Sequence, residues 1–303
     1  MTYPSKAELA RAAGILRAGG LVAFPTETVY GLGANALDEA AVRRIYEAKG
    51  RPSTSPLIVH IADLEMAPQV AAEWPKAAQK LAARFWPGPL TLILRKRLEV
   101  PALVTAGLDT VGVRMPAHPV ALELIRLVGV PVAAPSANRF MEISPTTAEH
   151  VRVALGGRVD CILDAGPCEV GIESTVLSLV GGRRILLRPG MISQRQIEEI
   201  IGPVDLGSQP ADGAGHVAPG LHQRHYAPKT PLYLLDAREA LPEGRGRLLN
   251  FPGEPESFAA SLYSELHAAD GEGWEWIAIR KPPATVEWAG ILDRLTRASR
   301  HGE

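Results

Sequence analysis

The chain has 303 residues, of which 46% are hydrophobic and 21% are charged, as is ordinary for a globular protein. Its length exceeds one typical domain, so we expect one medium domain and one small domain. The formal net charge of −1 argues against a whole-protein surface for nucleic acid or an anionic membrane, although a local basic patch is compatible with it.

The two cysteines and the N-terminus bear on the compartment. Cys161 and Cys168 fit neither a disulfide framework nor a zinc knuckle, so we expect reduced, structural thiols. The N-terminal segment carries Lys6 and Arg11 where a signal peptide has its apolar core, and no apolar run reaches the ~20 residues of a membrane span. We therefore expect a cytoplasmic protein without membrane contact.

The first predicted elements are a helix, a strand and a second helix. Ser5 and Glu8 form a capping box for a helix that ends at a Gly-Gly pair. The next strand should end at Pro25, which cannot donate to a ladder, and give way to the loop `PTETVYGLGAN`. Asp38 can cap the second helix.

Helices and strands then alternate as far as Gly202, which indicates an α/β domain. The predicted elements are strand 57–61, helix 75–85, strands 91–95 and 111–115, helix 119–128, strand 130–134 and a helix beginning near Ser144. `STVLSLV-GG-RRILLR` should form a hairpin with a two-residue Gly-Gly turn, so the sheet should be mixed. Ser193 opens the last helix of this domain.

The organisation predicted from these patterns is a domain over residues 1–205, a linker over 206–230 and a small α/β domain over 231–303. The linker is rich in Gly, Pro and Ala and has no period. Its end, `RHYAP`, groups Arg224, His225 and Tyr226, which are suited to anion, phosphate or ring contacts.

The glycine-rich stretch `GLGANA` follows a strand and precedes a helix, as a dinucleotide-binding fingerprint would. However, Pro25 separates the strand from the glycines, and the nearest plausible acid for the ribose, Asp63, lies far beyond the expected ~20 residues. A turn that needs glycine backbone angles is the favoured interpretation.

Lys49 and Arg51 flank Gly50 at the end of the second predicted helix, and two interpretations apply. Gly50 can be the residue that ends the helix, with the two cations complementing the negative end of its dipole. Alternatively, the glycine lets both side chains converge on one phosphate chain. Spacing alone favours the first interpretation.

Polar side chains gather at the ends of several predicted strands, in `PTET`, `DTVGVR`, `PSAN`, `IEST` and `LRPG`. In open α/β sheets ligands bind outside strand termini, so these side chains can line one pocket. Each cluster alone is more typical of a turn or cap. Because the chain has no G-x-x-x-x-G-K-[ST] phosphate loop, together they indicate another kind of nucleotide pocket.

These stretches, in order over residues 8–230, resemble the long, two-domain form of the threonylcarbamoyl-AMP synthase family, whose core is a YrdC-like domain. The matching segments are `AFPTETVYGLGANA`, `AKGRP`, `PLIVHI`, `WPGPLT`, `VGVRMPAHP`, `APSAN`, `SPTTAEHV`, `GIESTV`, `LRPG` and `RHYAP`. The resemblance implies a twisted mixed α/β sheet with helices around a positive concave cleft. It also implies a small Rossmann-like C-terminal α/β domain.

The activity that the resemblance implies is that of a nucleotidyltransferase. L-Threonine, bicarbonate or CO2, and ATP would give L-threonylcarbamoyl-AMP and pyrophosphate. The product would pass to a transferase complex that makes N6-threonylcarbamoyladenosine (t6A) at position 37 of tRNA, and a weak contact with tRNA belongs to this hypothesis. Mg2+ would accompany ATP, and no organic cofactor is expected.

The resemblance also implies site residues. Contacts with ATP would come from Lys49, Arg51, Ser53, Thr110, Ser136, Asn138, Ser144, Arg188 and Tyr226, with Lys49 and Arg51 catalytic. Contacts with threonine would come from Thr26, His60, Arg114, the Ala134 backbone and Ser174. The linker with Tyr226 would close over the cleft as a lid. Neither metal ligands nor a general base is indicated.

Three features depart from the family pattern: Phe140 and Met141 after `SAN`, Ser55 before Pro56, and a short C-terminal domain. The alternative functions are an RNA-binding module that uses the basic cleft and a carbamoyl-transfer domain like those of hydrogenase maturation. Near-zero net charge weakens the first. The absence of acylphosphatase-like and zinc-finger segments argues against the second.

Overall fold

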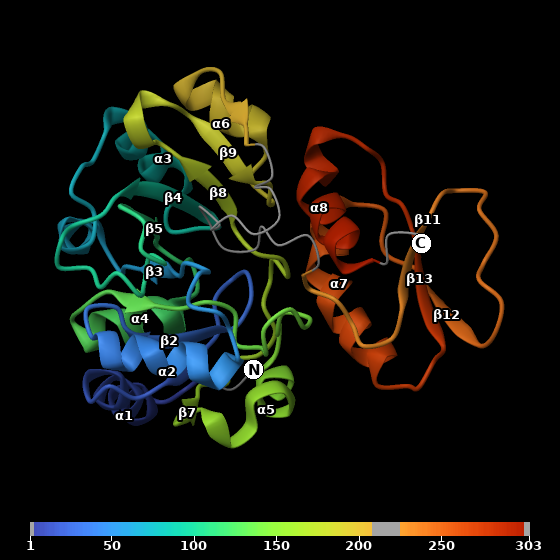
Figure 1. Cartoon of the computed structure of the whole chain (residues 1–303), viewed down its shortest axis with the longest axis horizontal. Helices are drawn as coiled ribbons and strands as arrows, with labels where there is room; N and C mark the ends of the chain where they lie inside the picture. The colour runs from blue at the N-terminus through green and yellow to red at the C-terminus, as the bar shows by residue number, and fades with distance from the viewer. Residues whose placement is uncertain (1–2, 208–224, 300–303) are drawn as a thin grey trace.

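The computed structural model describes residues 3–207 and 225–299, so most of the predicted linker, including Arg224, lies outside the described residues. The larger part of the described chain is a twisted mixed sheet with helices, as the sequence predicts (Figure 1). A smaller α/β unit follows it. Among the described residues, no helix combines the length and apolar character needed to cross a bilayer.

The large sheet has ten strands in the order β10-β9-β8-β4-β5-β3-β6-β2-β1-β7. Their bounds are β1 (Val22–Phe24), β2 (Gly31–Asn35), β3 (Ile58–His60), β4 (Leu90–Arg95), β5 (Thr110–Arg114), β6 (Val132–Ala133), β7 (Cys161–Ile162), β8 (Thr175–Ser178), β9 (Ile185–Arg188) and β10 (Asp205–Leu206). Strand β3 pairs with β5 in parallel and with β6 antiparallel, and β4 pairs with β5 antiparallel and β8 in parallel. The sequence analysis missed the two-residue strands β7 and β10.

Helices flank this sheet, and three of them begin at the predicted caps Ser5, Asp38 and Ser193, whereas the helix expected near Ser144 begins after Thr147. Their bounds are α1 (Lys6–Arg17), α2 (Glu39–Lys49), α3 (Lys76–Phe85), α4 (Pro119–Val128), α5 (Ala148–Leu155) and α6 (Gln194–Ile201), with the 3-10 turns η1 (Leu64–Gln69), η2 (Gly156–Arg158) and η3 (Val180–Gly182). Ser5 and Glu8 form the predicted capping box, and Asp38 accepts hydrogen bonds from the first backbone amides of α2. Gly50 ends α2 at φ 63°, which confirms the local interpretation of that glycine.

The glycines of `GLGANA` belong to a strand, so both interpretations of that stretch were wrong. Gly31 and Gly33 lie in β2, antiparallel to β1, and neither has a positive φ. A Cβ at Gly33 would lie 2.7 Å from Cε1 of Phe24 and 3.0 Å from Cγ1 of Val132. Glycine is needed here because neighbouring side chains fill the space where a Cβ would stand.

The predicted hairpin between β8 and β9 is present, but its turn is longer than two residues. Ser178 pairs with Ile185, so residues 179–184 connect the strands and include η3. Gly181 and Gly182 both have positive φ, 65° and 74°, as a Gly-Gly turn allows. The ladder register shifts only farther from the turn, between Val176 and Leu177, as at a β-bulge.

The C-terminal unit is a three-stranded parallel sheet in the order β11-β13-β12 with helices on it. Its elements are β11 (Leu232–Leu235), β12 (Gly246–Leu249), α7 (Pro255–Asp270), β13 (Trp276–Arg280), η4 (Val286–Trp288) and α8 (Ala289–Ala298). Figure 1 shows α7 and α8 between this sheet and the larger unit. One hydrophobic cluster spans the junction, because Val29, Ile172 and Tyr226 pack with Tyr263 and Ile291.

We predict opposite stability changes for alanine at two glycines. Gly33→Ala should lower the free energy of unfolding by ~1–3 kcal/mol, because the new Cβ forces Phe24 and Val132 apart. Gly14→Ala should raise it by ~0.5–1 kcal/mol, because this glycine lies inside α1 with open space around it. Urea unfolding measures both, and equal changes would contradict the packing argument.

Candidate active site

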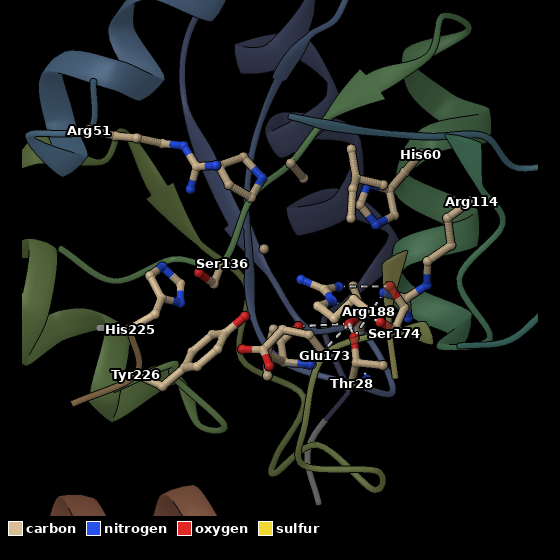
Figure 2. Close-up of a pocket in the computed structure, with 16 residues that line it drawn as sticks. Thr28, Arg51, His60, Arg114, Ser136, Glu173, Ser174, Arg188, His225 and Tyr226 are labelled. Atoms are coloured by element: carbon tan, nitrogen blue, oxygen red, sulfur yellow. Dashed lines mark hydrogen bonds between the residues drawn. The ribbon is translucent and has the colours of Figure 1, made fainter. Parts of the chain in front are cut away.

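A small cavity of about 50 Å³ lies at the centre of the large sheet, against the C-terminal end of the predicted linker. It is lined by Thr26, Thr28, Val29, Gly31, Arg51, Ile58, His60, Arg114, Ala134, Pro135, Ser136, Glu173, Ser174, Arg188, His225 and Tyr226. Figure 2 shows two groups of labelled side chains facing each other across it. Arg51, Ser136, His225 and Tyr226 form one group, and His60, Arg114, Thr28, Ser174 and Arg188 form the other.

Arg114, the last residue of β5, is buried and held by three partners. Its Nη2 forms an ion pair with Oε1 of Glu27 at 2.6 Å, and its Nη1 donates to Oγ1 of Thr28 at 2.9 Å. Its Nε donates to the carbonyl of Gly88 at 3.2 Å. A guanidinium has five N–H groups, so two remain for a ligand at the cavity. This geometry suits the grip of a carboxylate.

His60, the last residue of β3, is buried and pairs with Arg114 across the β3–β5 ladder. Burial and the neighbouring Arg114 guanidinium lower the pKa of His60 to about 3. Its Nδ1 is buried and has no hydrogen-bond partner among the described residues. A buried polar atom without a partner is costly, so this nitrogen is suited to a ligand's hydrogen-bonding group.

Ser174 and Arg188 meet where β8 begins and β9 ends. The Nε of Arg188 donates to the carbonyl of Ser174 at 3.1 Å, and its Nη2 donates to the hydroxyl oxygen of Ser174 at 3.2 Å. The hydroxyl oxygens of Ser174 and Thr91 lie 2.8 Å apart. Burial lowers the pKa of Arg188, although the side chain remains a cation at neutral pH. A serine hydroxyl and a positive charge therefore lie together at the cavity wall.

Lys49 fixes the `PSAN` loop and does not line the cavity. Its Nζ lies 2.6 Å from the carbonyl oxygens of both Ser136 and Asn138 and 3.1 Å from Oδ1 of Asn138. Burial and the Arg51 guanidinium lower the pKa of Lys49, and the Glu142 carboxylate opposes this shift only in part. The Oδ1 of Asn138 also accepts from the Ser136 hydroxyl at 2.6 Å, so Lys49 positions Ser136 at the cavity.

Arg51 does line the cavity, and its partner there is Ser55, the residue before Pro56 that departs from the family pattern. Its Nη2 donates to the Ser55 hydroxyl oxygen at 2.6 Å and to the Pro56 carbonyl at 3.0 Å. Its guanidinium carbon lies 5.8 Å from the centroid of the Phe140 ring. Burial lowers the pKa of Arg51 to about 10. The side chain thus stays positive at neutral pH in a prearranged position.

Tyr226 closes one side of the cavity and is 1% exposed. Its φ is +62°, a strained value for a residue other than glycine. Its hydroxyl has no hydrogen-bond partner among the described residues, and burial together with the Glu173 carboxylate raises its pKa. Phe140 and Met141 meet the same segment, since Phe140 packs against His225 and the amide of Ala227 donates to the Met141 carbonyl at 3.0 Å.

The structure brings most of the expected site residues together. Those lining the cavity are Thr26, His60, Arg114, Ala134, Ser174, Arg51, Ser136, Arg188 and Tyr226. Those outside its lining are Lys49, Ser53, Thr110, Asn138 and Ser144. Asn138 and Ser144 are buried nearby, Ser53 is exposed, and Thr110 begins the strand that Arg114 ends, about 13 Å away along the chain. Their contacts with ATP stay predictions.

The expected site residues did not include Thr28, Glu173 and His225, which also line the cavity. All three lie inside motifs that were noted, in `PTET`, `IEST` and `RHYAP`. Position within a motif is therefore a usable signal. The partners that orient these side chains lie far away in sequence, as for Thr28, which accepts from Arg114.

Comparison with known proteins adds to this geometry. A family model described as telomere recombination, covering Sua5, YciO and YrdC, matches residues 14–190, and one described as the C-terminal domain of threonylcarbamoyl-AMP synthase matches 192–300. Threonylcarbamoyl-AMP synthase of Bacillus subtilis is 42% identical over 96% of this chain and 93% of its own. The enzyme of that name from Pyrococcus abyssi is 53% identical over 74% of this chain and 67% of its own.

A solved structure agrees with these matches. The crystal structure of Pyrococcus abyssi Sua5 complexed with L-threonine superposes with a TM-score of 0.91 and 40% identity. The similarity covers 98% of this chain and 96% of that one, so it includes both the large sheet and the C-terminal unit.

We predict that Glu27→Gln lowers the free energy of unfolding by ~3–5 kcal/mol, because it leaves the buried Arg114 charge without its carboxylate. The matched control is Glu39→Gln, which breaks an exposed ion pair with Arg43 and should change stability by less than ~0.5 kcal/mol. Urea unfolding at pH 7 measures both. Similar losses of unfolding free energy in the two variants would show that burial does not determine how strongly the Glu27–Arg114 ion pair stabilises the fold.

Proposed function

Because the chain belongs to the threonylcarbamoyl-AMP synthase family, we propose that it joins L-threonine, bicarbonate or CO2, and ATP into L-threonylcarbamoyl-AMP and pyrophosphate. The observation that carries this proposal is the cavity, where three arginines and several hydroxyl groups from distant motifs meet. The threonine complex of the similar Pyrococcus abyssi structure supports the amino-acid substrate.

We assign the two sides of the cavity to the two larger substrates. Arg114, His60, Thr26, the Ala134 backbone and Ser174 would hold threonine, with the two remaining N–H groups of Arg114 on its carboxylate. The opposite group, with Arg51, Ser136 and Tyr226, would face the nucleotide (Figure 2). Arg188 contacts Ser174 and so stands where the amino acid and the α-phosphate would meet.

The proposed chemistry needs no protein nucleophile. The threonine amine adds to CO2 with loss of a proton, or to bicarbonate with loss of water, and gives a carbamate. A carbamate oxygen then attacks the α-phosphorus while pyrophosphate departs. Catalysis rests on placing the reactants in line and on fixed cations where phosphate charge develops. The buried Arg51 and Arg188 side chains are held by hydrogen bonds before any substrate arrives, which supports that role. Lys49 would act with Arg51, from its place beneath the `PSAN` loop.

Selection of threonine over valine would follow from buried polar atoms at the cavity. The Nδ1 of His60 has no partner among the described residues, whereas the Thr26 hydroxyl, which also lines the cavity, already donates to the Val29 carbonyl at 2.7 Å. A valine side chain offers no hydroxyl, so it would leave such an atom unpaired, which disfavours the wrong substrate.

Mg2+ is expected to enter the site with ATP. Within residues 3–207 and 225–299, no group of three or more His, Cys, Asp or Glu side chains could hold a metal ion. The two carboxylates nearest the cavity, Glu27 and Glu173, already pair with arginines. Protein ligands thus do not fit the ion, and phosphate oxygens with water would hold it. No organic cofactor is expected.

The small volume of the cavity supports a moving lid. Sites for small molecules typically enclose ~300–1,000 Å³, whereas this cavity has about 50 Å³. We propose that residues 1–205 are the catalytic domain, 206–230 the linker and lid, and 231–303 the C-terminal domain. Tyr226 would then move outward to admit ATP and return to exclude water from the labile carbamate.

The product would be handed to a t6A transferase complex for position 37 of tRNA, with at most a weak tRNA contact by this chain. The RNA-binding alternative is not favoured, because the cationic side chains at the cavity are buried and already hydrogen-bonded. Phosphate contacts with RNA need accessible cations.

The proposed function predicts that pyrophosphate release from ATP, with bicarbonate present, depends on L-threonine. Valine should support release at least ~10-fold more weakly, because it lacks the hydroxyl that the buried polar atoms bind. An assay for inorganic pyrophosphate after pyrophosphatase treatment measures both. Release that is the same with and without threonine would sink the proposal.

Tyr226 variants separate the ring from its hydroxyl. Tyr226→Phe should leave stability unchanged within ~1 kcal/mol, because the buried hydroxyl makes no hydrogen bond to the described residues. It should weaken ATP binding if the hydroxyl contacts nucleotide, and calorimetric titration measures that loss. Tyr226→Ala removes the ring as well and should add hydrolysis of the carbamate, seen as lower product yield per ATP consumed. Equal yields in both variants would argue against the lid.

A further inference from the structure

Arg294 of α8 is the largest fully buried side chain, and it reaches from the C-terminal unit to the loops that carry the cavity. Its Nε forms an ion pair with Oε2 of Glu173 at 2.7 Å, and its Nη2 donates to the Glu173 carbonyl at 3.2 Å. Its Nη1 donates to the carbonyl of Pro189 at 3.1 Å. One guanidinium therefore connects the segment before β8 with the segment after β9.

Glu173 links Arg294 to the cavity. It lines the cavity beside Ser174, and its Oε1 accepts from the Ser144 hydroxyl at 2.6 Å. Its Oε2 also accepts from the Tyr263 hydroxyl of α7 at 3.0 Å. Burial alone would raise the pKa of Glu173, but the guanidinium groups of Arg294 and Arg188 outweigh it and lower the pKa. The lowered pKa keeps the carboxylate charged at neutral pH, and its hydrogen bonds orient its neighbours.

The same guanidinium contacts the proposed lid. Its carbon lies 5.3 Å from the centroid of the Tyr226 ring, in cation–π geometry. Asp293 supplies a second carboxylate to Nη1 of Arg294 at 2.6 Å and also pairs with Arg297. The buried charges are therefore balanced within the network, as a buried guanidinium requires.

Close backbone packing holds α7 and α8 against these loops. A Cβ at Gly290 of α8 would lie 2.8 Å from the Cα of Gly190, two residues after Arg188. A Cβ at Gly171 would lie 2.2 Å from the carbonyl oxygen of Ala259 in α7. The two helices thus contact the `GIEST` and `LRPG` segments directly, with no side chain between them.

We propose that Arg294 is a positioning residue for the active site, through which the C-terminal domain sets the relative placement of Ser174, Arg188 and Tyr226. Strands β8 and β9 are joined by a hairpin at their other ends, so this ion pair constrains them where the substrates would bind. The inference rests on the proposed function for what those residues bind. By this inference the C-terminal domain contributes to turnover by positioning active-site residues.

The test compares Arg294→Gln with a matched control, Arg195→Gln. Arg195 of α6 pairs with Glu287 of η4 at 3.1 Å and joins the same two units, but it is exposed and far from the cavity contacts. Threonine-dependent pyrophosphate release should fall on the order of 10²-fold in kcat/KM for Arg294→Gln, because a small misplacement of reacting groups has that effect. Arg195→Gln should retain the wild-type value.

Two more variants separate positioning from general stability. Arg294→Lys keeps the charge but loses the planar fork, so it should restore only part of the activity. Tyr263→Phe removes a single hydrogen bond to Glu173 and should lower kcat/KM by about fivefold while folding normally. If Arg294 positions the site, the loss should appear in kcat and in KM for threonine. If Arg294 only stabilises the fold, its substitution should lower the melting temperature and leave kcat and KM of the folded enzyme unchanged.

The outcomes distinguish this inference from the proposed function. If wild-type protein releases pyrophosphate with threonine and folded Arg294→Gln or Tyr263→Phe does so at the wild-type kcat/KM, the positioning role is wrong and the function stands. If the wild type shows no such release, the function fails, and amide hydrogen exchange decides the inference. Faster exchange over residues 171–175 and 188–190 in Arg294→Gln than in Arg195→Gln supports it, and equal exchange overturns it.

Discussion

The structure depends on burying positive charge and pairing every buried cation inside the fold. Lys49, Arg51, Arg114, Arg188 and Arg294 are all buried, and each has carbonyl, hydroxyl or carboxylate oxygens around it. A cation taken out of water is costly unless its partners are fixed in place. The folding of the surrounding loops therefore arranges the charges before a substrate arrives, which is the condition for electrostatic catalysis of phosphate chemistry.

Local signals predicted local structure well. The capping box of Ser5, the cap at Asp38 and the left-handed Gly50 each act within one turn of helix, so their residues alone determine the outcome. Nine of the site residues expected from the ordered motifs also line the cavity. The glycines of β2 were misread because their reason is a neighbouring strand and the Phe24 ring, which no local pattern reveals.

The parts that could not be predicted depend on residues distant in sequence. Arg294 meets Glu173 across 121 positions, and although Glu173 lies in the noted `IEST` motif, nothing in either segment indicates the other as its partner. The place of Lys49 beneath the `PSAN` loop also differs from a simple picture of two cations converging on a phosphate, since its three donors contact protein oxygens. The family resemblance named Lys49 but neither Arg294 nor Glu173, and the packed structure shows which atoms these side chains contact and which units of the chain they join.

The left-handed backbone of Tyr226 bears on how readily the proposed lid opens. A non-glycine residue at φ +62° carries ~1–3 kcal/mol of strain, and the proposed movement of the lid away from the cavity would relieve it. Free energy of that size shifts the balance between the inserted and withdrawn arrangements by about 5- to 150-fold. Burial of the Tyr226 ring favours the inserted arrangement, whereas the backbone strain opposes it. In the proposed lid, glycine at this position would remove the strain that favours withdrawal, because glycine adopts positive φ without cost.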